Sequence, residues 1–146
     1  MSTYEKRAWW TRHGMTQRLA SESFREAAVT CGYLVAAADG SVSETEYDAL
    51  LDRLELLGGL DRDTIDQLLT DGGHTLDEAG FEPLIARVTE LIGDPSEAEA
   101  ALMLGLAVGL ADNDFSEPER EIATQLATAG GVSAERVEAM LADLRD

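Results

Sequence analysis

Leu34-Val-Ala-Ala-Ala-Asp39-Gly-Ser-Val42-Ser43-Glu-Thr-Glu46 is the first copy of a motif that occurs twice in this chain. The second copy reads Leu106-Ala-Val-Gly-Leu-Ala-Asp112-Asn-Asp-Phe115-Ser116-Glu-Pro-Glu119, and its Asp, Ser and Glu positions match at a constant offset of 73. In each copy an apolar run ends near an aspartate, and a serine then precedes a run with helical spacing. The repeat predicts two helix–loop–helix halves that pack as a pseudo-symmetric bundle.

Helical periodicity extends over most of the chain. Apolar residues recur at three- and four-residue steps, and no segment has clean strand alternation. Paired glycines at 58–59, 72–73 and 130–131 predict loops, with only a short helix around Ile65. We therefore expect an all-α, compact bundle of about seven helices, with residues 1–146 forming one domain. The expected helices cover about 23–38, a segment starting after Ser43, a short segment at 65–69, 84–92, 95–111, and two more after Ser116.

Composition narrows the class of protein. The chain has 146 residues, is 45% hydrophobic and carries a net charge of −18, so it is acidic and globular rather than disordered. Its longest apolar stretch, 100–111, is shorter than the roughly 20 residues of a membrane span. Acidic surfaces repel phosphate, which argues against nucleic-acid binding. The single cysteine, Cys31, lies among apolar helix positions and is expected to be a small buried residue. We expect a cytoplasmic protein.

The first 20 residues form a basic head on this acidic body. Residues 1–25 hold five of the eleven Lys and Arg residues but only two acids. The adjacent tryptophans within it cannot both be buried by one surface, so one is a candidate interaction anchor. The head is expected to contact a protein partner or, peripherally, the inner face of an anionic membrane. Its candidate contact residues are Lys6, Arg7, Trp9, Trp10 and Arg12.

Four carboxylates in the repeat are the main candidates for chemistry: Asp39, Glu46, Asp112 and Glu119. A purely structural interpretation covers the glutamates, because each lies three residues after a serine and completes a capping box at a helix start. The aspartates would then stabilise the turns, with Gly40 supplying a left-handed backbone conformation.

A second interpretation is that the four carboxylates converge across the pseudo-twofold. Carboxylates brought that close repel one another unless a cation lies between them, and Ca²⁺, Mg²⁺ or Mn²⁺ favours such oxygen ligands. The loop is not an EF-hand, since its twelfth position would be Leu50 in one copy and Ala123 in the other. Capping and metal binding can coexist. A third interpretation, an enzyme with paired acid and base carboxylates, has no substrate-pocket signal in the sequence.

The chain resembles the tellurite-resistance TerB family. The resemblance rests on two blocks, Phe24 to Glu46 and Ser96 to Glu119, and extends over nearly the whole chain, basic head included. One departure is Asp112-Asn113, where the family usually has Asp-Gly; Asn tolerates the same backbone geometry. The resemblance implies an all-helical protein with an acidic face, divalent-metal binding at Asp39, Glu46, Asp112 and Glu119, and a link to tellurite resistance and stress systems. It also implies protein partners, some of them membrane-associated.

The sequence thus predicts a non-enzymatic, metal-associated protein-interaction module of a tellurite-resistance or stress-response system. The alternatives are an acidic helical scaffold without metal and the carboxylate-based enzyme. The sequence leaves the identity of the metal, the partner and the oligomeric state open.

Overall fold

The computed structural model describes residues 14–18, 21–38, 40, 42–58, 60–109 and 116–145. These residues form helices without any strand, which confirms the predicted all-α class. Seven of the helices within this part of the chain have ten or more residues, in agreement with the predicted number. The described helices are α2 (Met15–Arg18), α3 (Glu22–Ala36), α4 (Glu44–Gly58), α5 (Arg62–Ala79), α6 (Glu82–Leu91), α7 (Pro95–Gly109), α8 (Glu117–Ala129) and α9 (Ala134–Arg145).

Helices α3 and α7 form the centre of the bundle and make its most extensive helix–helix interface. Helix α7 is apolar around most of its circumference, as expected of a helix enclosed by others. It starts at residue 95, as the sequence predicts. The amide of Glu97 donates a 2.9 Å hydrogen bond to Oδ1 of Asp94, and Pro95 occupies the first turn. The buried hydrophobic residues described on α7 are Ala98, Ala100, Ala101, Leu102, Met103, Leu104, Leu106 and Ala107.

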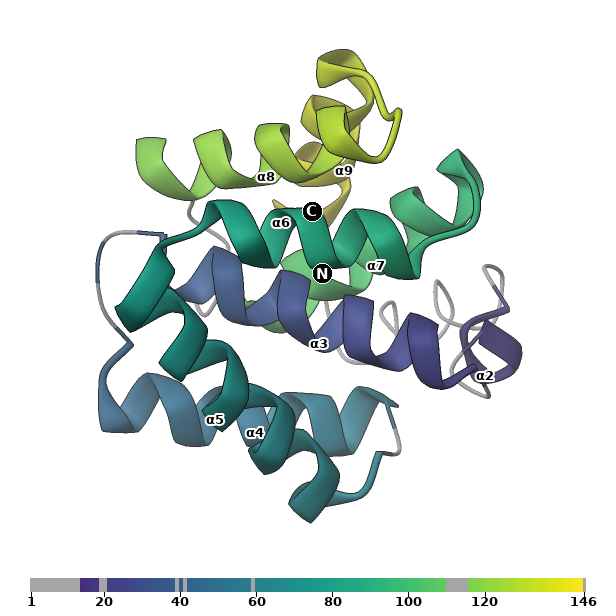
Figure 1. Ribbon diagram of the computed structural model, residues 1–146. Coiled ribbons are helices and arrows are strands. Elements are labelled where there is room, and N and C mark those ends of the chain that lie inside the picture. The colour runs from purple at the N-terminus through teal and green to yellow at the C-terminus, as the bar shows by residue number, and fades with distance from the viewer. Residues whose placement is uncertain are drawn as a thin grey trace.

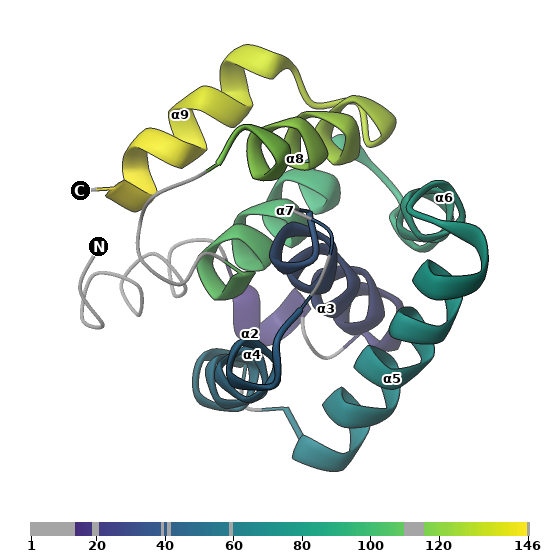
Figure 2. The same ribbon diagram turned by 90° about the vertical axis from the view of Figure 1, so that its left-hand side faces the viewer.

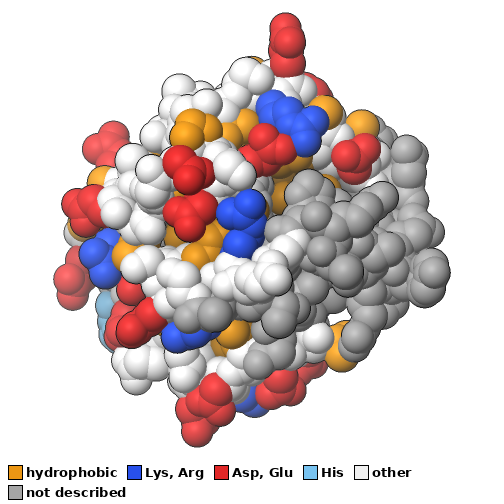
Figure 3. Space-filling model, turned by 90° about the vertical axis from the view of Figure 1, so that its right-hand side faces the viewer, with side chains coloured by type: hydrophobic (Ala, Val, Ile, Leu, Met, Phe, Trp, Pro, Cys, Tyr) orange, Lys and Arg blue, Asp and Glu red, His pale blue; other side chains and the backbone are white. Residues whose placement is uncertain are grey.

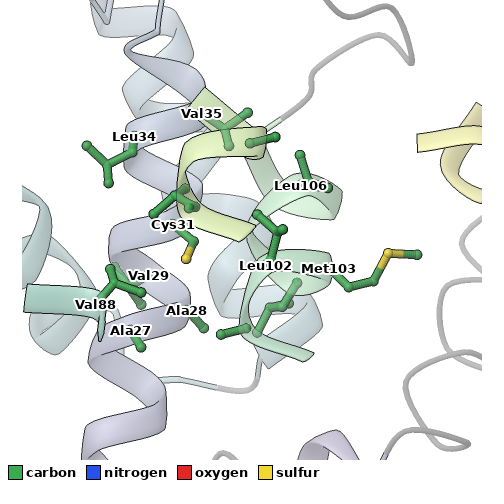
Figure 4. Packing of buried hydrophobic residues seen from close by; sticks show 14 of the residues in the cluster. Ala27, Ala28, Val29, Cys31, Leu34, Val35, Val88, Leu102, Met103 and Leu106 are labelled. Atoms are coloured by element: carbon green, nitrogen blue, oxygen red, sulfur yellow. The ribbon is translucent and has the colours of Figure 1, made fainter. Parts of the chain in front are cut away.

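The two central helices approach closely because their contact residues are small. A Cβ placed on Gly105 of α7 would lie 2.5 Å from Cβ of Cys31 and 2.9 Å from the backbone nitrogen of Gly32. Figure 4 shows Cys31 on α3 beside α7, which carries Leu102 and Leu106. Gly105 therefore sets how near the helix axes come, and the larger side chains pack around that crossing.

The remaining helices lie on two sides of the central pair. Figures 1 and 2 place α6, α8 and α9 on one side and α4 and α5 on the other. Each central helix contacts its own following helix and also the corresponding helix of the other half, since α3 touches α4 and α8, and α7 touches both as well. This reciprocal pattern is what a pseudo-twofold would produce. Superposition of 34–56 on 106–128 stays a prediction.

Helix α5 departs from the sequence-based expectation. We expected a short helix and a loop at Gly72-Gly73, but α5 runs unbroken from Arg62 to Ala79. The two glycines make room for a neighbouring side chain instead of reversing the chain. A Cβ on Gly73 would lie 3.2 Å from the hydroxyl oxygen of Tyr33, and one on Gly72 would lie 3.7 Å from the Tyr33 ring. The expectation was wrong because paired glycines serve close packing as well as turns.

Arginines pair with carboxylates on adjacent helices. Nε of Arg87 on α6 lies 2.8 Å from Glu26 of α3, and Arg136 on α9 lies 2.6 Å from Glu99 of α7. Arg62 on α5 lies 2.9 Å from Asp52 of α4, and Arg120 pairs with Glu138 between α8 and α9. On the face in Figure 3, acidic side chains are spread over the described surface beside fewer basic ones. These exposed pairs contribute little individually and leave most of the acidic charge unbalanced.

Candidate functional site

Both serine–glutamate pairs of the repeat form capping boxes. The amide of Ser43 donates a 3.1 Å hydrogen bond to Oε1 of Glu46, and the amide of Glu46 donates one of 3.1 Å to Oγ of Ser43. In the second copy the amide of Ser116 donates to Oε1 of Glu119 at 2.7 Å, and the amide of Glu119 donates to Oγ of Ser116 at 3.3 Å. The predicted capping role of the two glutamates is confirmed.

Capping occupies only one oxygen of each carboxylate. Oε1 accepts the serine amide in both copies, and among the described residues Oε2 of Glu46 and of Glu119 accepts no hydrogen bond. Glu46 is exposed and Glu119 is partly exposed. Each glutamate is therefore fixed in position by its own helix start and keeps one oxygen for a further ligand.

The two helix starts lie at the same end of the bundle. In Figure 1 both α4 and α8 begin at the left, one below and one above α3. Figure 2, which views that end, places them on opposite sides of the α3–α7 pair. The backbone of Gly40 has a φ of 114°, the conformation predicted for the first loop. Asp39 and Asp112 lie outside the described residues, so convergence of the four carboxylates stays a prediction.

Two cavities lie at this end of the bundle, one beside each repeat copy. The first, of about 390 Å³, is lined by Gly40 and Val42 of the first loop, by Tyr33 and Tyr47, and by one face of α5. The second, of about 520 Å³, lies between Ala38, the α5–α6 junction and the start of α8 at Pro118. Neither cavity could be recognised from the sequence pattern. A signal for the first is Gly72-Gly73, which the pattern predicts to be a loop.

The structure describes Cys31 but not the predicted contact residues of the basic head. Cys31 is buried, with 1% of its surface exposed, and burial raises the pKa of its thiol to about 12. The predicted head contacts Lys6, Arg7, Trp9, Trp10 and Arg12 lie outside the described residues. Within the part of the chain that the structure describes, three or more His, Cys, Asp or Glu side chains do not gather into a metal-binding group. No helix in that part is long and apolar enough to cross a membrane.

The fold and the paired motifs define a class: an all-α domain in which two copies of a helix–loop–helix motif carry capped glutamates at one end of the bundle. Residues 25–142 match the family model described as tellurite resistance protein TerB. The chain belongs to the TerB family, as the sequence resemblance predicted. The basic head precedes the matched region. Comparison with curated proteins and with solved structures gives no match.

Proposed function

We propose that this protein is a non-enzymatic, metal-associated interaction module of a tellurite-resistance or stress-response system. The family assignment supports the link to tellurite resistance. The metal association rests on one observation: each repeat fixes a glutamate by its capping box and leaves the second carboxylate oxygen open. Oxygen donors of this kind suit hard divalent cations such as Ca²⁺, Mg²⁺ and Mn²⁺.

The ligands would be Asp39 with Glu46 in the first copy and Asp112 with Glu119 in the second. The sequence predicts one cation shared by all four carboxylates. Because α4 and α8 lie on opposite sides of the α3–α7 pair, we propose in its place one cation for each repeat. A bound cation would offset part of the negative charge at this end of the bundle. The acidic surface would then present organised cation sites to a partner.

Thermal unfolding of the whole chain tests metal association. A ligand that binds only the folded state stabilises it by about 2.7 kcal/mol at a concentration of 100 times Kd. We expect Ca²⁺, Mg²⁺ or Mn²⁺ to raise the Tm of the wild-type protein. Asp39→Asn combined with Asp112→Asn should abolish the increase while the circular dichroism of the helices is unchanged. The same increase in the variant would contradict the proposal.

The acidic scaffold without metal remains the second candidate, and the capping boxes favour it. They give both glutamates a structural role that needs no cation. In that case Ca²⁺, Mg²⁺ and Mn²⁺ would leave the Tm unchanged in both proteins.

The basic head is proposed as a separate contact for an anionic membrane or a partner. Its candidate contact residues precede residue 25, where the family match begins, and this supports a role for them apart from the matched region. A basic cluster alone binds membranes weakly, so the tryptophans would need to contribute. Vesicles with anionic lipids should bind the wild-type chain at low salt and bind less of a Trp9→Ala, Trp10→Ala variant. Equal binding by the two proteins, or none, would remove the membrane role.

A further inference from the structure

The proposed cation sites do not account for the side chains that line the first cavity. Its walls are the side chains of Tyr33 and Tyr47 and the α5 residues Thr70, His74 and Asp77, and Leu69 adds an apolar surface. A volume of about 390 Å³ is at the lower end for ligand pockets and admits one long side chain. The described lining includes two aromatic rings and a carboxylate, and among the described residues neither Lys nor Arg lines the cavity.

The two tyrosines are held in place from α5. The hydroxyl of Tyr47 donates a 2.5 Å hydrogen bond to Oδ1 of Asp66. Tyr33 lies against the α5 backbone where Gly72 and Gly73 leave space for its ring. Burial, followed by the charge of Asp77, raises the pKa of the Tyr33 hydroxyl, so the ring is neutral at physiological pH. The aromatic walls are therefore preorganised.

Negative charge at the cavity is not balanced by the described residues. Asp77 is exposed and, among the described residues, forms no ion pair and accepts no hydrogen bond. Helix α5 carries five carboxylates and a single arginine, Arg62, which already pairs with Asp52 on α4. The cavity thus combines a negative potential with aromatic surface, which is the environment that attracts a cation carried on an apolar stem.

We propose that this cavity binds the arginine side chain of a basic protein partner. A guanidinium stacks on aromatic rings and forms paired hydrogen bonds with a carboxylate, which an ammonium cannot do as well. The methylene stem would lie on Leu69, the guanidinium beside Tyr33 and Tyr47, and Asp77 would balance its charge. Gly40 and Val42 of the first loop also line the cavity, but the side chains proposed to contact the guanidinium are not the proposed metal ligands, so this site does not depend on the proposed metal.

Titration of the full-length protein with N-acetyl-arginine amide, followed by ¹H–¹⁵N NMR, tests the proposal. We expect saturable shifts centred on residues 70–77, Tyr33 and Tyr47. The citrulline analogue, which has the same shape without the charge, should give none. Asp77→Asn should weaken binding about three- to fivefold.

The matched control is Glu78→Gln, which makes the same charge change one residue away on α5 and outside the cavity. It should leave the affinity within twofold of that of the wild-type protein. Equal losses in Asp77→Asn and Glu78→Gln would mean attraction by net charge only and would overturn the proposal. Equal shifts with citrulline, or no saturable shifts at all, would overturn it as well.

Discussion

At the residue scale, the central helix pair depends on small side chains at one crossing. Gly105 faces the backbone of α3, so a methyl group there would meet atoms that cannot rotate away. Gly105→Ala should lower the free energy of unfolding by about 2 kcal/mol or more, even though alanine favours helices. Urea denaturation measures the difference. A stability equal to that of the wild-type protein would mean that α3 and α7 do not cross at this glycine.

The cysteine beside that crossing offers a second test. Cys31 is buried and its pKa is raised to about 12, so the thiol stays protonated at neutral and moderately basic pH. In native buffer at pH 8 it should react with a thiol reagent only through unfolding, and urea should make it fully reactive. Rapid reaction of the folded protein would contradict the packing.

The raised pKa of the Cys31 thiol predicts how the stability of the folded protein changes with pH. The unfolded chain releases this proton at about pH 9, whereas the folded protein retains it until about pH 12. The contribution of the thiol is complete below pH 9 and is lost as the pH rises between these values. A Cys31→Ala variant should lack this part of the alkaline loss of stability.

At the element scale, the helix starts could be predicted from the sequence. Ser43 with Glu46, and Ser116 with Glu119, match a local rule that depends on residues three apart, and the structure confirms both. Asp94 and Pro95 obey a similar rule. By contrast, Gly72 and Gly73 lie inside α5 and face Tyr33, which is about 40 residues away in sequence, so a local rule could not identify this glycine pair as a packing contact.

Loss of one capping box should cost a measurable amount of stability. Ser116→Ala and Ser43→Ala remove the acceptor for the amide of the glutamate, and each should lower the free energy of unfolding by about 1 kcal/mol. Ser96→Ala is a suitable control, because the hydrogen bond that its hydroxyl accepts from Arg18, at 3.3 Å, is exposed. Chemical denaturation of the three variants gives the comparison. Equal stabilities would argue against the caps.

Substitution of a glycine of α5 by alanine should raise the stability of the protein, whereas loss of a capping box should lower it. At Gly72 an added methyl group would make an ordinary contact with the Tyr33 ring, so Gly72→Ala should stabilise the protein by about 0.5–1 kcal/mol. At Gly73 the methyl group would press on the Tyr33 hydroxyl, and that variant should gain less. Thermal unfolding of the Gly72→Ala and Gly73→Ala variants measures the difference in stability. A destabilised Gly72→Ala would indicate that the chain breaks at this point, as the sequence first suggested.

At the scale of the whole molecule, the repeat predicted the all-α architecture but not its cavities. The equivalence of the two motifs follows from residues visible in the sequence, and it places both helix starts at one end of the bundle. The cavities form where three helices and a loop meet, and their walls come from residues with no shared local pattern. Tyr33, Tyr47 and Asp77 could therefore be found only from the folded chain.

We propose that the repeat glutamates bind divalent cations in addition to capping their helices. A Glu46→Gln, Glu119→Gln variant separates these roles, since glutamine can still complete a capping box but supplies no charge. Isothermal titration calorimetry of the full-length protein with Ca²⁺, Mg²⁺ and Mn²⁺ is the most direct measurement. We predict saturable binding of two ions per wild-type chain for at least one metal. Binding in the variant should be at least tenfold weaker, with unchanged helical circular dichroism. The absence of binding to the wild-type protein, or equal binding by the variant, would contradict the claim.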